Sequence, residues 1–320
     1  MSMLDPWLPE RWTISQAEMR TPLPKITIGI LSYNRIDDLR RTLDCITRSV
    51  QYPDYEIIVV DNASDDGSAE MTRTEFPSVK IVAINQNIGT AGRNIFYKEA
   101  RGKYVFSFDD DSFPATPATI YEVVSFLERR AEVDAVTLYY YQPLTGFVET
   151  GEIQRFRSGG SHENGFEGLF YAEGGMCIRT SSFLRISGYD DEFLVYGEGL
   201  DLTLQMYKCD MTLLYHPGFA TLHMKSFSNR DNQRMVWRQS RNHIWTLAKH
   251  FPLYALLVLV GVLILRFGVS IALHPKRLMS YLKGILDGIA GIPAQRRKTR
   301  KLTLRQVLGL KRWYLFLYRW

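Results

Sequence analysis

Apolar runs that end in polar residues alternate with amphipathic segments through the first third of the chain, and this alternation constrains the fold more than any other feature. Residues 25–33 form an apolar, β-branched run that ends at Asn34, which indicates a buried strand. Residues 36–50 then carry apolar side chains at helical spacing. The same patterns predict further strands and helices at 55–60, 68–76, 79–84, 89–100 and 104–108. Elements in this order form βαβ units, and therefore an α/β fold with a mixed, mainly parallel sheet flanked by helices.

Polar residues follow several of these strands at the point where each strand ends. Asn34 follows the first strand, Asp61 and Asn62 follow the second, and Asp109 follows the fourth. Parallel sheets bind their ligands beyond the carboxyl ends of the strands, so we expect the functional site at this edge. The first strand is not followed by G-x-G-x-x-G, and the chain contains no G-x-x-x-x-G-K-[ST]. These absences argue against a nicotinamide-binding domain and a P-loop ATPase.

Asp109, Asp110 and Asp111 place three carboxylates in a row after a strand that is predicted to be buried. Their mutual repulsion is destabilising unless a positive charge lies between them. Mg²⁺ or Mn²⁺ prefers such oxygen ligands together with phosphate. An acidic turn exposed to water, or a helix cap ahead of Pro114, is the alternative interpretation. The position of the triplet at a strand end, together with Asp61, favours a divalent metal.

Several motifs occur in one order along residues 25–225. They are IGILSYNR (28–35), IVVDNASDDGS (58–68), NQNIGTAGRN (85–94), FDDDS (108–112), and GYDDEF (188–193) with YGEGLDL (196–202) and His223. In sequence and spacing the chain resembles the family-2 inverting glycosyltransferases of the GT-A fold. The resemblance implies a Rossmann-like GT-A domain. Such a domain transfers a sugar from a UDP-, GDP- or dTDP-linked donor to a glycan or lipid-linked glycan.

The resemblance also implies roles for individual residues. It assigns the donor to Tyr33, Asn34, Asp61, Asn87, Gly89, Arg93, Asn94, Asp109 and Asp110. It assigns Mn²⁺ or Mg²⁺ to Asp109, Asp111 and His223. The histidine follows a strand expected at 212–215 and a turn at Pro217. Judged from the residues alone, loop packing also accounts for Gly89, a surface helix position for Arg93, and a structural role for His223.

Inverting transfer requires a carboxylate that removes the proton of the acceptor hydroxyl. The resemblance places this base at a Glu-Asp or Glu-Glu pair, but Glu198 is followed here by Gly199. We expect Glu198 to be the base, with Asp201, Asp190 or Asp191 as alternatives, although Glu198 could instead cap the helix that follows. The acceptor is expected to contact Gly174, Gly175, Asp190 and Asp191. A tight turn at the start of a strand would equally explain the two glycines.

The C-terminal region differs from the rest of the chain in charge and hydropathy. Residues 251–320 contain thirteen Lys or Arg and one acid, Asp287, whereas residues 1–250 contain 26 basic and 33 acidic residues. Residues 253–273 are mostly apolar and are interrupted by Arg266. An arginine inside a bilayer is destabilising, and a single span would leave the following basic residues on the outer side of the membrane.

We therefore predict an interfacial or re-entrant helical extension, peripheral or monotopic at the cytoplasmic face of the membrane, with its basic residues near anionic lipid headgroups. Aromatic residues within 313–320 would add interfacial contacts. A buried core helix and an oligomer contact are the alternatives. Nucleic acid is not an expected partner, because the region contains no recognition module.

These patterns divide the chain into an N-terminal extension (1–24), a catalytic domain (25–250) and the basic C-terminal region (251–320). The extension lacks the basic end and apolar run of a signal peptide. Cys45, Cys177 and Cys209 lack the spacing of a disulfide framework, which indicates a reducing, cytoplasmic environment. Gly199 is also compatible with an inactive homologue that acts as a binding or scaffold subunit. A sugar-nucleotide pyrophosphorylase would need a glycine-rich basic loop that residues 32–35 do not supply.

Overall fold

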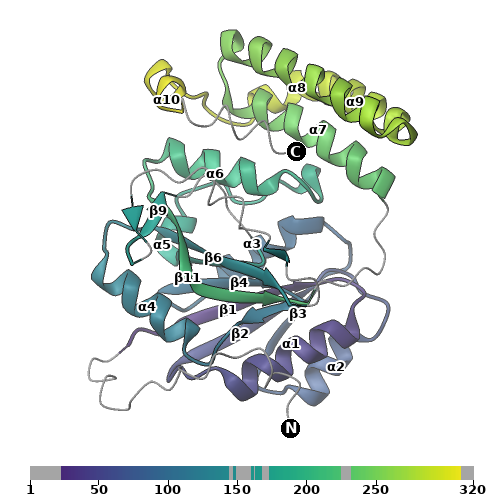
Figure 1. The fold of residues 1–320 in the computed structure, drawn as a ribbon. Coiled ribbons are helices and arrows are strands. Elements are labelled where there is room, and N and C mark those ends of the chain that lie inside the picture. Colours follow the sequence, from purple (N-terminus) through teal and green to yellow (C-terminus); the bar gives the residue numbers. More distant parts are fainter. Residues whose placement is uncertain are drawn as a thin grey trace. The chain divides into compact units, whose positions relative to one another are not determined.

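The computed structural model describes residues 23–143, 147–148, 160–161, 163–167, 173–224 and 232–310. The chain divides into two compact units (Figure 1): Met1–Tyr189 with Cys209–Ser226, and Asp190–Lys208 with Phe227–Trp320. The segment Asp190–Lys208 and residues 232–250, both predicted as part of the catalytic domain, thus group with the C-terminal helices. The N-terminal extension up to residue 22 and the aromatic residues of 313–320 lie outside the described residues.

The first unit is built on one sheet with the strand order β3-β2-β1-β4-β10-β6-β11-β9-β8, to which β5 and β7 are added. The strands are β1 (Ile26–Ser32), β2 (Tyr55–Asp61), β3 (Lys80–Ala83), β4 (Tyr104–Asp109), β5 (Ser112–Pro114), β6 (Ala135–Gln142), β7 (Phe147–Val148), β8 (Gly160–Ser161), β9 (Gly165–Glu167), β10 (Gly175–Arg179) and β11 (Leu213–His223). Strand β10 is antiparallel to β4 and β6, whereas β1 to β4, β6 and β11 share one direction. The predicted mixed, mainly parallel sheet is therefore confirmed.

Helices cover both faces of this sheet (Figure 1). They are α1 (Ile36–Ser49), α2 (Ser68–Glu75), α3 (Arg93–Glu99), α4 (Thr119–Arg129) and α5 (Thr180–Phe183), with the 3₁₀ turn η1 (Gly89–Gly92) ahead of α3. On one face, Ile28 of β1 belongs to the same buried core as Leu39 of α1. On the other face, a Cβ at Gly29 would overlap the ring of Phe96 from α3. A glycine is therefore needed where α3 approaches the sheet.

The register of the parallel strands aligns their carboxyl ends. Ser32 at the end of β1 lies opposite Asp61 of β2, and Leu31 lies opposite Asp109 of β4. The polar residues that follow these strands in the sequence therefore meet at one edge of the sheet, as the pattern of strand ends predicted.

Strand β11 is longer than the sequence indicated. Pro217 was expected to end the strand in a turn, but β11 continues to His223, with a shift of register against β6 between His216 and Ala220. Proline has no N–H for the ladder, so strands accommodate it at such irregularities. Beyond this bulge, His223 lies opposite Ser112 of β5. The continuation of the strand therefore brings the histidine next to the acidic triplet.

The second unit is helical. Its elements are the 3₁₀ turns η3 (Asp191–Phe193) and η4 (Pro275–Arg277) and the helices α6 (Glu198–Lys208), α7 (Asn232–His250), α8 (Leu253–Leu273), α9 (Leu278–Arg297) and α10 (Leu304–Gly309). Helices α7 and α9 pack closely, because a Cβ at Gly284 of α9 would lie 2.6 Å from the Trp237 carbonyl of α7. The side chain of Asn242 donates to the carbonyls of Phe193, Val195 and Tyr196. This contact joins the segment ahead of α6 to α7.

Helix α8 passes through Arg266 without interruption. Among the described residues it is the one helix whose length and composition would allow it to cross a membrane. Leu256, Leu259 and Leu263 are buried within the second unit, whereas Leu257 and Leu265 are 68% and 75% exposed. The helix therefore packs along one side and presents apolar side chains on another.

Candidate active site

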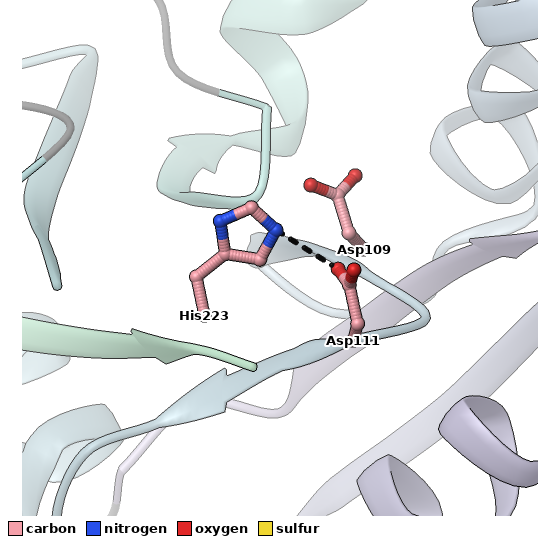
Figure 2. A group of neighbouring side chains, drawn as sticks. All are labelled: Asp109, Asp111 and His223. Carbon is pink, nitrogen blue, oxygen red and sulfur yellow. Dashed lines mark ion pairs between the residues drawn. The ribbon is translucent and has the colours of Figure 1, made fainter. Parts of the chain in front are cut away.

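Asp109, Asp111 and His223 come together at the carboxyl edge of the sheet (Figure 2). Asp109 ends β4, Asp111 lies in the turn to β5, and His223 ends β11. One ligand atom from each residue lies within 4.8 Å of the others, and the Asp111 Oδ1 to His223 Nε2 distance is 3.1 Å. Figure 2 shows the imidazole facing the two carboxylates. The three residues predicted as metal ligands are therefore neighbours in the fold.

Arg93 is the counter-ion of Asp109. Its Nη2 forms an ion pair with Asp109 Oδ1, and its Nη1 donates to Ser107 Oγ at 2.8 Å and to the Phe108 carbonyl at 3.1 Å. The side chain is buried, so the alternative of a surface helix position for Arg93 is wrong. Such a buried guanidinium orients the carboxylate as well as neutralising it.

Arg35 is the counter-ion of the other two carboxylates, Asp110 and Asp111. Its Nη1 lies 3.0 Å from Asp110 Oδ1 and 3.2 Å from Asp111 Oδ2, while Ser32 Oγ donates to Asp110 Oδ2. Burial raises the pKa of Asp110 to about 7, Arg35 opposes that rise, and the other two aspartates add to it. Arg35 was not predicted as a site residue. Its position just after the first strand, which ends at the same sheet edge as the acidic triplet, could have indicated that Arg35 belongs to the site.

The chemistry of this cluster suits a hard divalent cation. Two carboxylates and an imidazole are common ligands of Mn²⁺, and carboxylates also suit Mg²⁺. Asp111 and His223 are buried, so water screens their interaction with a cation only weakly. The three carboxylates of the triplet face two arginines. A divalent cation would offset the remaining negative charge, so the residues fit the predicted metal.

The second strand end holds the turn that precedes α3. Asn62, one of the polar residues expected at this edge but given no specific role, accepts from the Ile88 amide at 3.0 Å and donates to the Gly89 carbonyl at 3.0 Å. Asn87 Oδ1 accepts from the Gly89 amide at 2.8 Å, and Gly89 has a φ of 63°. A positive φ favours glycine. The turn therefore has a structural need for Gly89 in addition to any contact with a donor.

Asp61 is buried beside this turn. Its Oδ2 accepts from the Ser64 amide at 3.3 Å, whereas its Oδ1 has no hydrogen-bond partner among the described residues. An unsatisfied buried carboxylate oxygen is costly. A ligand that donates an N–H or O–H at this point would remove the deficit.

The remaining residues predicted to bind the donor differ in their surroundings. Tyr33 is 45% exposed, and Asn34 adopts a φ of 51° and accepts from the Asp65 amide at 2.8 Å. Asn94 exchanges two hydrogen bonds with the backbone of Tyr189, at 2.8 and 2.9 Å. The Asn94 amide therefore holds the chain near Tyr189, and its contact with a donor stays a prediction.

Gly174 and Gly175, predicted to contact the acceptor, lie where β10 begins. A Cβ at Gly174 would overlap Tyr140 Oη and the Asp109 carboxylate, and a Cβ at Gly175 would lie 2.9 Å from Thr221 Oγ1. The glycines thus allow close packing around Asp109. Their contact with an acceptor stays a prediction.

The predicted catalytic and acceptor carboxylates of the second unit have different partners. Glu198 begins α6 and is buried. Asp201 Oδ2 accepts from Lys249 at 2.9 Å and from Gln205 at 2.7 Å, and its Oδ1 lies 2.7 Å from His250 Nε2. Lys249 also bonds to Asp190 at 3.0 Å. Asp201 and Asp190 are therefore members of a buried charge network.

Two members of this network, Lys249 and His250, were not predicted, because nothing in a helix ending in Lys-His marks a distant carboxylate partner. Burial lowers the pKa of His250 to about 4, with Asp201 opposing that change. Burial alone would raise the pKa of Asp201, but His250 and Lys249 outweigh it and hold this pKa below its ordinary value. Lys249 and His250 are therefore both partners of Asp201, one on each of its carboxylate oxygens.

The family model for glycosyl transferase family 2 matches residues 27–186, half of the chain. The chain therefore belongs to glycosyl transferase family 2. The matched residues contain Asp61, Arg93 and the acidic triplet, whereas His223 and the second unit lie beyond them.

Two relatives illustrate the extent of the similarity. The uncharacterized glycosyltransferase YwdF of Bacillus subtilis (strain 168) is 38% identical over 107 residues, which cover 32% of this chain and 38% of that protein. The poly-β-1,6-N-acetyl-D-glucosamine synthase of Staphylococcus epidermidis is 25% identical over 236 residues, which cover 68% of this chain and 55% of that protein. The chain thus spans about half, or less, of the length of these relatives.

Solved structures share the fold. The mannosyltransferase PcManGT of Pyrobaculum calidifontis, in complex with GDP-Man and Mn²⁺, has a TM-score of 0.57 at 16% identity, covering 98% of this chain and 86% of that one. GalNAc-T7 with UDP, GalNAc and Mn²⁺ has a TM-score of 0.57 at 14% identity, covering 73% and 49%. The predicted GT-A architecture is therefore confirmed.

The buried imidazole of His250 predicts a loss of stability in mild acid. Its pKa is about 4 in the fold and 6.5 in a free side chain, so the unfolded chain takes up the proton first as the pH falls. The free energy of unfolding should then decrease from pH 6.5 toward pH 4, by up to about 1.4 kcal/mol per pH unit. In urea denaturation, His250→Gln should flatten this decrease, whereas His274→Gln, at an exposed position, should not. Equal slopes for wild type and His250→Gln would contradict the assignment.

Proposed function

We propose that this protein is a metal-dependent, inverting glycosyltransferase that moves a sugar from a nucleoside-diphosphate sugar to a glycan or lipid-linked glycan. The observation that carries the proposal is the meeting of Asp109, Asp111 and His223 at the carboxyl edge of the sheet. Asp109 and Asp111 also lie within the matched family region. The solved structures of PcManGT and GalNAc-T7, which share the fold, contain Mn²⁺ and a nucleotide or nucleotide sugar.

The residues of the candidate site would have two roles, metal binding and orientation of the metal ligands. Asp109, Asp111 and His223 would hold the cation, which when bound offsets charge on the departing diphosphate. Arg93 and Arg35 pair with the carboxylates and orient them. This arrangement supports a preorganised site, in which the ligands need little rearrangement when the donor arrives.

The surroundings of Asp61 favour some nucleobases in the donor over others. The unpartnered Oδ1 of Asp61 needs a donor group, and uracil, thymine and guanine each offer a ring N–H next to a carbonyl. Cytosine has an unprotonated ring nitrogen at the equivalent place and offers only its exocyclic amine as a donor, so it would have to shift its position to pair with Asp61. We therefore infer a UDP-, dTDP- or GDP-linked donor, and CDP serves as a chemical control.

For the base we propose Glu198. Asp201, the alternative, already accepts from two basic side chains and a glutamine. The depressed pKa of Asp201 makes it a weak proton acceptor. Asp190 is likewise paired, with Lys249 and Lys298. Of the acids in the motif at 196–202, Glu198 is the one that remains, so it is the better candidate.

We further propose that the second unit binds the cytoplasmic face of an anionic membrane. Exposed apolar side chains occur on α8 and α9, namely Leu253, Tyr254, Leu257, Val258, Val262, Ile264, Leu265, Val269, Leu273, Leu278, Met279, Leu282, Leu286 and Ile289. Lys276 and Lys283 are exposed in the same region. Apolar side chains beside basic ones are typical of helices that lie in the headgroup layer. Such a location would suit a lipid-linked acceptor.

Nucleotide binding tests the metal and donor assignments. In calorimetric titrations of UDP, GDP, dTDP and CDP, with and without Mn²⁺, we expect metal-dependent binding of one of the first three and none of CDP. Asp111→Asn should weaken that binding by about tenfold or more. Asp54→Asn, which alters an exposed carboxylate, is the matched control and should bind as wild type. Absence of binding for every nucleotide in the presence of Mn²⁺ would refute the proposal.

Turnover tests the base. With a membrane extract as the source of acceptor, Glu198→Gln should lower acceptor-dependent release of the nucleoside diphosphate by about 10²- to 10⁴-fold. Donor affinity should stay unchanged, because the base acts on the acceptor. Glu70→Gln, at an exposed carboxylate of α2, should behave as wild type. Undiminished turnover in Glu198→Gln would exclude it as the base, and no acceptor-dependent release by wild type would favour a scaffold role.

Vesicle flotation tests the membrane surface. We expect the protein to float with vesicles of phosphatidylcholine and phosphatidylglycerol, and to bind less well when the anionic lipid is omitted. Leu257→Glu combined with Leu265→Glu should weaken binding about tenfold or more, because both side chains are exposed on α8. Leu184→Glu, at a 61% exposed position of the first unit, should bind as wild type. Equal flotation of the two variants would argue against this surface.

A further inference from the structure

Tyr140 is a buried tyrosine in a run of three on β6. It is 5% exposed, whereas Tyr139 and Tyr141 are partly exposed and stack on each other with centroids 6.3 Å apart. Successive side chains of a strand point to opposite faces. Tyr140 therefore lies on the other face of the sheet from its two neighbours.

Two of the candidate metal ligands contact this one side chain. Tyr140 Oη donates to Asp109 Oδ2 at 2.9 Å, and the ring stacks on the imidazole of His223 with centroids 4.6 Å apart and planes at 13°. Asp109 belongs to β4 and His223 to β11. Tyr140 is thus a common support for ligands that come from two different strands.

The packing around Tyr140 restricts its position. A Cβ at Gly174 would overlap both Tyr140 Oη and Asp109 Oδ2. In the ladder between β6 and β11, Tyr140 lies opposite Thr221, two residues before His223. The backbone register and the missing side chain at position 174 together hold the phenol between the carboxylate and the imidazole.

We propose that Tyr140 is a positioning residue for the metal site. Its hydroxyl sets the rotation of the Asp109 carboxylate, and its ring sets the plane of the His223 imidazole. Arg93 pairs with the other oxygen of Asp109, so both oxygens are held while each keeps a lone pair for a cation. This inference rests on the proposed function, because it assumes that Asp109 and His223 bind a metal.

Groups that hold metal ligands in place contribute strongly to affinity, and their loss typically lowers it by about 10- to 100-fold. Tyr140→Phe removes the hydroxyl and keeps the ring, so it releases the carboxylate alone. Tyr140→Leu removes both contacts and releases the imidazole as well. We therefore expect about tenfold weaker Mn²⁺ binding for the phenylalanine variant and a larger loss, toward about 100-fold, for the leucine variant.

The experiment measures Mn²⁺ binding to the full chain by electron paramagnetic resonance of free Mn²⁺, with thermal denaturation as the check on folding. Tyr141→Phe is the matched control on the opposite face of β6, and it should bind Mn²⁺ as wild type does. In an Asp109→Asn background, Tyr140→Phe should cause little additional loss, because its hydroxyl acts through Asp109. A general packing role would not produce that dependence on Asp109.

The outcomes separate this inference from the function on which it rests. Wild-type affinity in Tyr140→Phe, or an undiminished effect of that change in the Asp109→Asn background, would overturn the positioning role and leave the metal site intact. No Mn²⁺ binding by wild type, or binding that survives Asp111→Asn, would overturn the metal site and the positioning role together. A tenfold loss confined to the hydroxyl and dependent on Asp109 would support the inference.

Discussion

The compensation of three adjacent carboxylates is the constraint on which the site depends. Asp110 and Asp111 are buried, and buried charge is strongly destabilising unless it is paired and hydrogen-bonded. Arg35 arrives just ahead of α1, Arg93 at the start of α3, and His223 at the end of β11. The elements that build the sheet edge thus also deliver its two guanidinium counter-charges and its imidazole, so folding and site assembly depend on the same contacts.

The end of β11 contributes the long-range part of this assembly. A bulge lets the strand continue past Pro217, and pairing with β5 then places His223 opposite Ser112. Ser112 in turn accepts from the Asp109 amide at 2.8 Å and donates to the Gly174 carbonyl at 2.7 Å. A short strand after the acidic triplet therefore ties the histidine, the triplet and the start of β10 into one hydrogen-bonded structure.

The second unit is organised by a different set of charges. Asp190 and Asp201 share Lys249, and Lys298 adds a second bond to Asp190 at 2.8 Å. These pairs explain why Asp190–Lys208 groups with the C-terminal helices although it lies within the region that the charge balance assigned to the catalytic domain. At least one basic side chain of the C-terminal region, Lys298, thus pairs with an acid of the same unit. The exposed basic side chains are the ones available to a partner.

The amino-acid sequence predicted the βαβ order, the edge of the sheet at which the candidate site lies and, through the family resemblance, the three candidate metal ligands. Hydrophobic periodicity and polar strand ends are local properties that can be seen in the sequence. The assignment of the metal ligands came from the family motifs. The sequence did not distinguish Tyr140 from Tyr139 and Tyr141, and it did not indicate Arg35 or the partners of Asp201. The tertiary structure decided those, because they depend on which strand face meets which neighbour and on contacts between residues far apart in the chain. The register of β5, β6 and β11 and the packing of α3 and α7 set these distances, and no local pattern encodes them.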